Sequence, residues 1–514
     1  MRARFWRRAA ILPVAALSVA TVAPHASADA PFFTSTPSML TLDASAPAGT
    51  TVLPIISVGD TVGGFTFEGI PDGIGAMPGS GGNTEVFVNH EQSRVPFAGF
   101  ADFDWSSVSH LTLAPSGGVL AGSEPLPDSA GFQRFCSSTM AGPNEGLDSY
   151  LYLTGEEAPE AVPVPAGAPY GPDPAYAPEN LRQSGYAVVL DPVTGAYTQV
   201  AGMGRHNHEN SMVLPGAWDK IAVISGDDTF TAPSSQLYLY LADDEDAIWA
   251  DQGNLLAFRV THKNGVRVAP GNAFNGANDY GDVAAGDHLQ GRFIRVPAAI
   301  ARGTTATPPQ DALERWSNRN NVFQFIRVED TAYDPDVPLG QNPVMYFSDT
   351  GSSSAVPDPT TGRLTAGTGG TFGNGRIFKM TFAKQDPRRV VDFSIVLDGN
   401  AATNPLAPAP AMRNPDNLGI SSNSLMIQED VSSAFESRII RLNLSTGAVS
   451  VVGRVNTTGW ESSGIVDASD FYGSGAWLLD VQAHSIFVEG PTLIDGINYK
   501  TEGGQLMLLT VPGS

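Results

Sequence analysis

The sequence predicts an all-β protein and, within that class, a β-propeller of about six blades with long insertions in its loops. Short β-branched or aromatic runs alternate with tight turns along most of the chain. Gly and Pro are abundant, with 55 and 39 residues, and long amphipathic helical patterns are nearly absent. A propeller arranges many short sheets radially, which protects their edges and directs their loops to a central channel. A pair of β-sandwich domains is the alternative fold.

Individual segments justify the strands in chain order. Near the N-terminus, residues 65–68 are a candidate for the strand that closes the ring. Residues 186–200 and 438–452 each place a Thr-Gly turn between two apolar runs, so both are expected to form hairpins. Residues 377–395 have the same arrangement around an Asp-Pro turn. Residues 344–349 are expected to form an inner strand that ends at a polar turn.

Residues 1–30 are predicted to be an export signal, and residues 31–514 a single propeller domain. Arginines precede an apolar stretch over residues 9–23, which ends near small residues. The pair Arg7-Arg8 also permits a twin-arginine route, so both Sec and twin-arginine export remain open. No later stretch approaches about 18 uninterrupted apolar residues. We therefore expect no membrane span and a secreted, periplasmic or cell-surface protein.

The formal net charge is −24, from 53 acidic and 29 basic side chains. Such a surface repels nucleic acid and anionic lipid, so neither is expected as a partner, and the protein is expected to be a monomer. Carboxylates can hold hard cations such as calcium, although most of these acidic residues are expected to be solvated surface groups. With 42% hydrophobic residues, the chain can bury a sizeable core.

Cys136 is the only cysteine of the chain. A lone thiol cannot form an internal disulfide, so a role beyond packing would be metal ligation or reactivity. Acidic motifs precede and follow it: Asn89-His90-Glu91, Gly155-Glu156-Glu157 and His206-Asn207-His208-Glu209-Asn210. The two histidines of the last motif lack the H-E-x-x-H pattern of a zinc site, so they are expected to orient or pack rather than to bind metal.

Several short motifs follow one another between about residue 86 and about residue 484. They are Val86-Phe-Val-Asn-His-Glu91, Phe135-Cys136, Tyr152-Leu-Thr-Gly-Glu156-Glu157, Gly204-Arg-His-Asn-His-Glu209, Ser225-Gly-Asp227-Asp228, Arg327-Val-Glu329-Asp330, Asn414-Pro-Asp416-Asn417-Leu418 and Ile427-Gln-Glu429-Asp430. In this order they resemble the PhoX family of secreted alkaline phosphatases, which are β-propellers with a calcium and iron active site. The ordered set, with one cysteine correctly placed, is more specific than any single motif.

The resemblance implies a small-molecule phosphoester substrate and a pair of ferric ions, with calcium ions beside them and phosphate between. It assigns iron to Glu91, Cys136, Glu209 and Glu329. It assigns calcium to Glu156, Glu157, Asp227, Asp228 and Asp330. Arg327 becomes the catalytic cation that faces phosphate, a role that suits its planar fork of donors. Clustered cations would offset the charge of a phosphomonoester and stabilise the transition state.

The chain also departs from the family pattern. Residues 137–149 replace a glycine-rich run, and Gly155 stands where a second cysteine often precedes the paired glutamates. The first expectation is a secreted, metal-dependent phosphomonoesterase of the alkaline phosphatase type. A phytase-like or phosphodiester-cleaving hydrolase is one alternative. A non-catalytic, calcium-stabilised propeller that binds a protein or glycan is another, because a fold alone does not fix function.

Overall fold

The computed structural model describes residues 30–93, 105–168, 170–229, 235–268, 278–360, 363–401, 412–431, 434–487, 492–494, 497–499 and 502–514. Pro31–Ser514 form one compact unit. The predicted export signal lies outside the described residues, apart from Ala30. Among the helices that the structure describes, none is long and apolar enough to cross a membrane.

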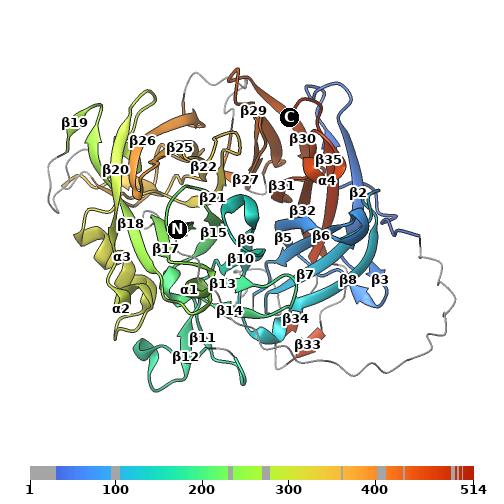
Figure 1. Cartoon of the computed structure of the whole chain (residues 1–514), viewed down its shortest axis with the longest axis horizontal. Helices are drawn as coiled ribbons and strands as arrows, with labels where there is room; N and C mark the ends of the chain where they lie inside the picture. The colour runs from blue at the N-terminus through green and yellow to red at the C-terminus, as the bar shows by residue number, and fades with distance from the viewer. Residues whose placement is uncertain are drawn as a thin grey trace, which may run out of the picture. The chain divides into compact units, whose positions relative to one another are not determined.

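The unit is built from antiparallel four-stranded meanders, as a propeller requires (Figure 1). The first meander contains β5 (Pro71–Pro78), β6 (Thr84–His90), β7 (Ser107–Leu113) and β8 (Val119–Leu126). The second contains β9 (Phe135–Ala141), β10 (Leu151–Glu156), β13 (Ala187–Leu190) and β14 (Tyr197–Gln199). β13 and β14 pair as the hairpin predicted over residues 186–200, which confirms that prediction.

The next two meanders are joined in one ten-stranded sheet. One contains β15 (His208–Val213), β16 (Ile221–Asp227), β17 (Leu237–Ala242) and β18 (Asn254–Lys263), and the other β21 (Val328–Tyr333), β22 (Val344–Asp349), β25 (Arg376–Ala383) and β26 (Asp386–Asp398). β20 (Leu289–Arg295) pairs with both outer strands, β18 and β26. The sequence predicts six blades, and of the six meanders four are separate sheets, whereas two are fused through β20.

Two predictions concern strands of this sheet. β25 and β26 pair as the hairpin expected over residues 377–395. β22 does end at a polar turn, but it is the second strand of its meander, because β21 lies on its inner side. The expectation of an inner strand at residues 344–349 is corrected accordingly. β22 is almost wholly buried because it has a paired neighbour on each side.

The N-terminal segment completes the last sheets of the ring. The fifth meander contains β27 (Pro415–Ile420), β28 (Ser424–Glu429), β29 (Arg438–Asn443) and β30 (Val449–Val455), with β1 (Leu40–Leu42) as an added outer strand. The sixth contains β31 (Glu461–Asp467), β32 (Ala476–Phe487), β35 (Glu502–Thr510) and β2 (Thr51–Ser57). β29 and β30 form the hairpin predicted over residues 438–452.

β2, rather than residues 65–68, closes the ring. Phe65–Thr66 instead form the short strand β4, which pairs with β3 (Thr61–Val62). The two segments, β2 and residues 65–68, differ in length and in burial. β2 has seven residues, and Ile55 and Ile56 at its end are fully buried in the cluster between the last and first meanders. Burying one such side chain contributes about 1.5–3 kcal/mol.

The inner strands determine where a site can form. β5, β9, β15, β21, β27 and β31 are the innermost strands of their meanders, and they contact one another in a closed cycle. Figure 1 shows them gathered in the middle of the sheets. Each has a break in its pairing register next to its second residue. A β-bulge turns a side chain in a new direction, and here it repeats around the whole ring.

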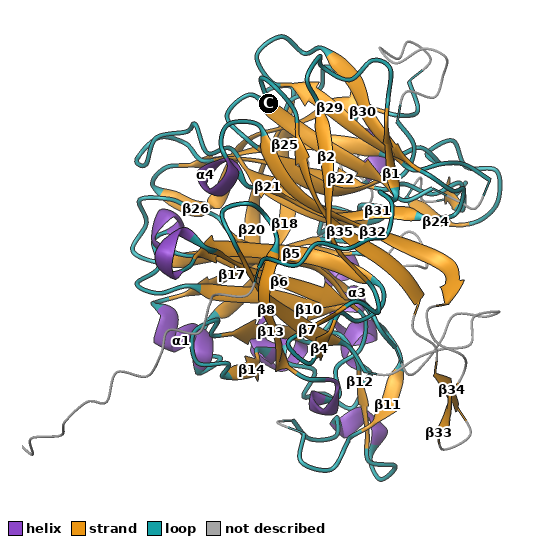
Figure 2. Ribbon diagram, turned by 90° about the vertical axis from the view of Figure 1, so that its right-hand side faces the viewer, coloured by secondary structure: helices purple, strands orange, loops and turns teal. Residues whose placement is uncertain are grey.

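Short elements complete the described structure. The helices are α1 (Glu245–Trp249), α2 (Ala298–Ala301), α3 (Pro309–Arg319) and α4 (Ser469–Tyr472). The remaining strands are β11 (Ala161–Pro163), β12 (Leu181–Gln183), β19 (Val266–Arg267), β23 (Ala355–Pro357), β24 (Leu364–Ala366), β33 (Thr492–Ile494) and β34 (Ile497–Tyr499). In Figure 2 the hairpins β11–β12 and β33–β34 project from the same side of the unit.

Candidate metal centre

The residue that directly follows the last pair before the register break, or that lies at the break, occupies an equivalent place in each inner strand. Because such a break recurs in every inner strand, these side chains are positioned alike. They are Asp72, Cys136, Glu209, Glu329 and Asp416 and, on β31, where the break lies one residue later, Ser463. Five of the six are acidic or thiol side chains, which are metal-ligand types. The ring therefore converges carboxylates and the lone thiol from segments that are far apart in the sequence.

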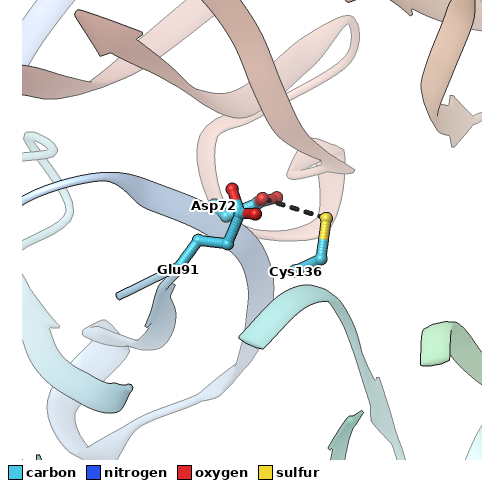
Figure 3. A group of neighbouring side chains, drawn as sticks. All are labelled: Asp72, Glu91 and Cys136. Carbon is cyan, nitrogen blue, oxygen red and sulfur yellow. Dashed lines mark hydrogen bonds between the residues drawn. The ribbon is translucent and has the colours of Figure 1, made fainter. Parts of the chain in front are cut away.

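The five acidic and thiol residues, with two residues that directly follow second strands, form three groups that could hold cations. The groups are Asp72, Glu91 and Cys136; Cys136, Glu157 and Glu209; and Glu209, Glu329 and Asp416. Within each group, one ligand atom per residue lies within 4.8 Å of the others. Cys136 and Glu209 are each shared by two groups, so the three groups are continuous. Figure 3 shows the first group, in which both carboxylates approach the sulfur.

The thiol of Cys136 is surrounded by negative charge. Its Sγ lies 3.2 Å from Asp72 Oδ2 and 3.3 Å from Glu209 Oε1, so either carboxylate can accept its single S–H hydrogen. Burial, and then the charges of Asp72 and Glu209, raise the pKa of Cys136 well above its usual value. A thiolate ligand at neutral pH would therefore require a bound cation.

The carboxylates repel one another in the same way. Burial, and next the charge of Glu91, raise the pKa of Asp72 to about 7. Burial and neighbouring acids also raise the pKa values of Glu209, Glu329 and Asp416. Uncompensated buried charges are costly, and cations would remove this cost.

The donor set itself fits bound metal ions. Asp72 Oδ1 and Asp416 Oδ1 are buried and, within the described part of the chain, have no hydrogen-bond partner. Buried acceptors without donors are expected where a cation completes the site. Carboxylate oxygens suit calcium, whereas a thiolate suits a softer transition metal. The residues present therefore fit a mixed centre of the kind that the sequence motifs imply.

Glu156 and Glu157 are adjacent but have different partners. Arg182 donates to both oxygens of Glu156, at 2.6 and 2.7 Å, and the N–H groups of Gln133 and Tyr186 donate at 2.8 and 3.1 Å. Glu157 instead belongs to one of the three groups. Successive strand residues point in opposite directions, which separates the two carboxylates. Glu156 thus holds a buried arginine, whereas Glu157 reaches the centre.

Asp227 and Asp228 are separated in the same way at the end of β16. Asp227 accepts a hydrogen bond from Thr229 Oγ1 at 2.9 Å and belongs to none of the three groups. Asp228 accepts two hydrogen bonds from Arg327, at 2.7 and 2.6 Å. Arg327 also lies 3.2 Å from Glu329 Oε1. Arg327 is therefore at the edge of the centre, with its fork oriented by Asp228.

Asp330 is turned away from the groups. Its Oδ1 accepts from its neighbour Thr331 N–H at 2.6 Å and from the side-chain amide of Asn210, and its Oδ2 accepts from Leu418 N–H at 2.8 Å. These bonds connect β21 to β15 and β27. Asp330 thus holds neighbouring inner strands together, while Glu329, one residue earlier, faces the other carboxylates.

The two histidines of the fourth motif have packing contacts. The ring centroids of His206 and His208 are 3.8 Å apart, and both side chains are buried. His208 Nδ1 lies 2.9 Å from Ser225 Oγ, and its Nε2 lies 3.1 Å from the Gly204 carbonyl oxygen. Neither histidine belongs to the three groups, and their orienting or packing role stays a prediction.

The sequence motifs did not assign Asp72 and Asp416 to the site. Both follow a proline at the start of an inner strand, in Pro71-Asp72 and Pro415-Asp416. This shared Pro-Asp signal could have identified them. The stretch that departs from the family pattern, residues 137–149, touches the centre through Ser137, which donates to Glu209 Oε1 at 2.5 Å. At its end, the N–H of Ser149 and that of Asp148 donate to Glu245 beside α1.

Fold and site together define a β-propeller with an anionic, thiol-containing candidate metal centre where the inner strands meet. A family model described as alkaline phosphatase PhoX matches residues 151–470. The chain belongs to this family, which places it among phosphoesterases of the alkaline phosphatase type.

One solved structure agrees with this fold. Pseudomonas fluorescens PhoX in complex with vanadate, a transition-state analogue, is similar with a TM-score of 0.60 and 16% identity, over 94% of this chain and 98% of that chain. An α-L-arabinofuranosidase mutant from Fusarium graminearum has a TM-score of 0.37 and 7% identity, over 86% of this chain and 98% of its own. The second value is too low to carry an argument. No curated protein matches the sequence.

Proposed function

We propose that this protein is a metal-dependent phosphomonoesterase whose centre contains calcium and ferric iron. The observation that carries the proposal is the continuous series of three anionic groups around Cys136 and Glu209. Iron would be held by Glu91, Cys136, Glu209 and Glu329. Calcium would be held by Glu157 and Asp228, with Asp72 and Asp416 as further ligands of the cluster. When bound, these cations would supply positive charge to the phosphoryl group and its transition state.

The chain's own residues would bind and orient the phosphate. Arg327 presents donors in a fixed plane, and its two hydrogen bonds to Asp228 hold that plane in place. Its side chain is 21% exposed, so a substrate can approach it from solvent. Ser137 and Thr350 donate to Glu209 and Glu329, at 2.5 and 2.6 Å, and so restrict the orientation of both carboxylates.

Cys136→Ser and Glu329→Gln are each expected to abolish turnover of a generic phosphomonoester such as p-nitrophenyl phosphate. Serine cannot supply a soft thiolate, and glutamine removes one negative charge from the third group. Glu85→Gln is the control, because Glu85 binds His110 and Thr112 on the outer part of the first meander. Normal turnover by either site variant would rule out this mechanism.

A substrate panel separates phosphomonoesterase from the related alternatives. Cleavage of phosphodiesters or phytate with failure of simple monoesters would identify a propeller hydrolase of different specificity. Absence of cleavage of every ester, with calcium still bound, would favour a calcium-stabilised binding module. The proposed enzyme should act on several monoesters, because the groups described here would contact the phosphate rather than a particular alcohol.

Metal removal is expected to abolish turnover and to lower Tm by about 5 °C or more, because bound cations stabilise only the folded protein. The measurement is thermal unfolding with and without a chelator, together with iron and calcium counted per chain by plasma mass spectrometry. Restoring both metals should restore both properties. Calcium without iron in the natively produced protein would contradict the proposed ferric centre.

We also propose that the protein acts outside the cytoplasm as a monomer, after export through residues 1–30 by the Sec or twin-arginine route. The basic and apolar pattern of those residues supports export. N-terminal sequencing of the protein recovered outside the cytoplasm would test it, and a mature N-terminus near residue 31 is the expected result.

A further inference from the structure

His484 lies beside the candidate metal centre on β32. Two residues earlier on this strand, Gln482 Nε2 donates to Asp72 Oδ2 and to Glu91 Oε2, both at 3.0 Å. His484 is two residues beyond this side chain, where the pairing of β32 with β35 becomes irregular. The histidine is 30% exposed, whereas Gln482 is buried.

Two glutamates orient the imidazole. His484 Nδ1 bonds Glu502 Oε2 at 2.7 Å, and the Glu502 side chain is only 2% exposed. On the other side, Nε2 lies 3.8 Å from Glu461 Oε2, which is beyond a direct hydrogen bond. Burial lowers the pKa of His484, but Glu461 and Glu502 outweigh it and raise that pKa well above the usual value. Burial, and then the charge of Asp430, raise the pKa of Glu461 to about 8, although its contact with His484 lowers it.

The two ring nitrogens are held differently: Nδ1 bonds Glu502 at 2.7 Å, whereas Nε2 faces Glu461 Oε2 at the longer distance of 3.8 Å. Because Nδ1 is engaged by Glu502, a proton on Nε2 is the one that can be transferred to another molecule. Arg327 cannot release a proton under ordinary conditions, and Asp228 engages its guanidinium. The other histidine beside the first group, His90, is fully buried, with Gly69 and Ser109 at its two nitrogens.

We propose that His484 is the general acid of the reaction and gives its Nε2 proton to the leaving oxygen of the phosphoester. This inference rests on the proposed phosphomonoesterase function. As the bond between phosphorus and the ester oxygen breaks, that oxygen takes the proton and leaves as an alcohol. A water-derived oxygen forms the new bond to phosphorus, and phosphate is released. The partly exposed imidazole then regains a proton from solvent, so the cycle balances with water as the only co-reactant.

The leaving group provides the test. A p-nitrophenolate ion leaves readily without protonation, whereas the alkoxide of glycerol phosphate does not. His484→Gln is expected to lower kcat/KM for glycerol phosphate by about 10²–10³-fold, the range of general acid catalysis, but for p-nitrophenyl phosphate by less than about tenfold. Glu502→Gln should also lower kcat/KM more for glycerol phosphate than for p-nitrophenyl phosphate, because it removes the negative charge that holds Nδ1 of His484. His110→Gln is the matched control, since His110 bonds Glu85 at 2.8 Å in a different meander.

The outcomes separate the two proposals. Equal losses on both substrates in His484→Gln, with unchanged iron and calcium content, would show a structural role and overturn the assignment. If His484→Gln does not fold, His484→Ala is tested instead, with free imidazole added to replace the missing ring. Imidazole is then expected to restore turnover of glycerol phosphate only. Equal rescue of both substrates, or none, would overturn it. Failure of the wild-type protein to cleave either monoester would instead overturn the proposed function and this inference with it.

Discussion

Glu209→Gln is expected to lower kcat/KM for a phosphomonoester by at least about 10²-fold and to reduce the metal bound per chain. Changes to groups that merely orient metal ligands cost about 10–100-fold, so a ligand itself should cost more. Glu209 belongs to two of the three groups and lies between Cys136 and Glu329. Loss of its charge therefore weakens two cation positions at once. No other carboxylate in the three groups is shared in this way.

The same variant should fold normally. Glutamine keeps an oxygen that can accept a hydrogen bond from Ser137 Oγ. It also removes a buried negative charge that is unfavourable, since burial and the charge of Glu329 raise the pKa of Glu209. Steady-state kinetics, plasma mass spectrometry and thermal unfolding in chelator measure the three properties. Glu145→Gln is the control, because Glu145 bonds the Tyr333 hydroxyl, at the other end of β21 from Glu329. Full metal content in Glu209→Gln would exclude Glu209 as a shared ligand.

Glu156→Gln and Glu157→Gln are expected to differ sharply although the residues are neighbours. Glu156→Gln should lower the free energy of unfolding by about 3–5 kcal/mol, the usual cost of removing one partner of a buried ion pair. The side chains of Glu156 and Arg182 are both 0% exposed, and the arginine would lose both charged hydrogen bonds. Urea unfolding in the presence of chelator measures this loss without the contribution of bound metal.

Glu157→Gln should instead lower metal content and turnover and leave the metal-free stability unchanged or higher. Burial, followed by the charges of Asp228 and Glu209, raises the pKa of Glu157 well above its usual value, so its charge is unfavourable without a cation. Each variant serves as the control for the other. A larger loss of metal-free stability in Glu157→Gln than in Glu156→Gln would mean that the two side chains have been assigned to the wrong faces.

Much of the architecture could be predicted from local sequence. The alternating runs and Thr-Gly turns over residues 186–200 and 438–452 gave the correct hairpins, because strand periodicity and turn chemistry are local properties. The place of β22 as the second strand of its meander, and the identity of the closing strand, could not be predicted in this way. Both depend on which strand is added next to which edge. That choice is made by long-range packing, as in the burial of Ile55 and Ile56 against the first meander.

The sequence by itself determined the family, the propeller class and the short acidic segments near Cys136, since these follow from residue type and order along the chain. Only the tertiary structure decided which acid in each pair faces the centre. Strand alternation separates Glu156 from Glu157, and the repeated register break turns Glu329 inward and Asp330 toward neighbouring strands. Asp72 and Asp416 join the site for the same reason. Ring closure brings residues at the start of distant inner strands together, and no local sequence pattern shows that these residues are close in space.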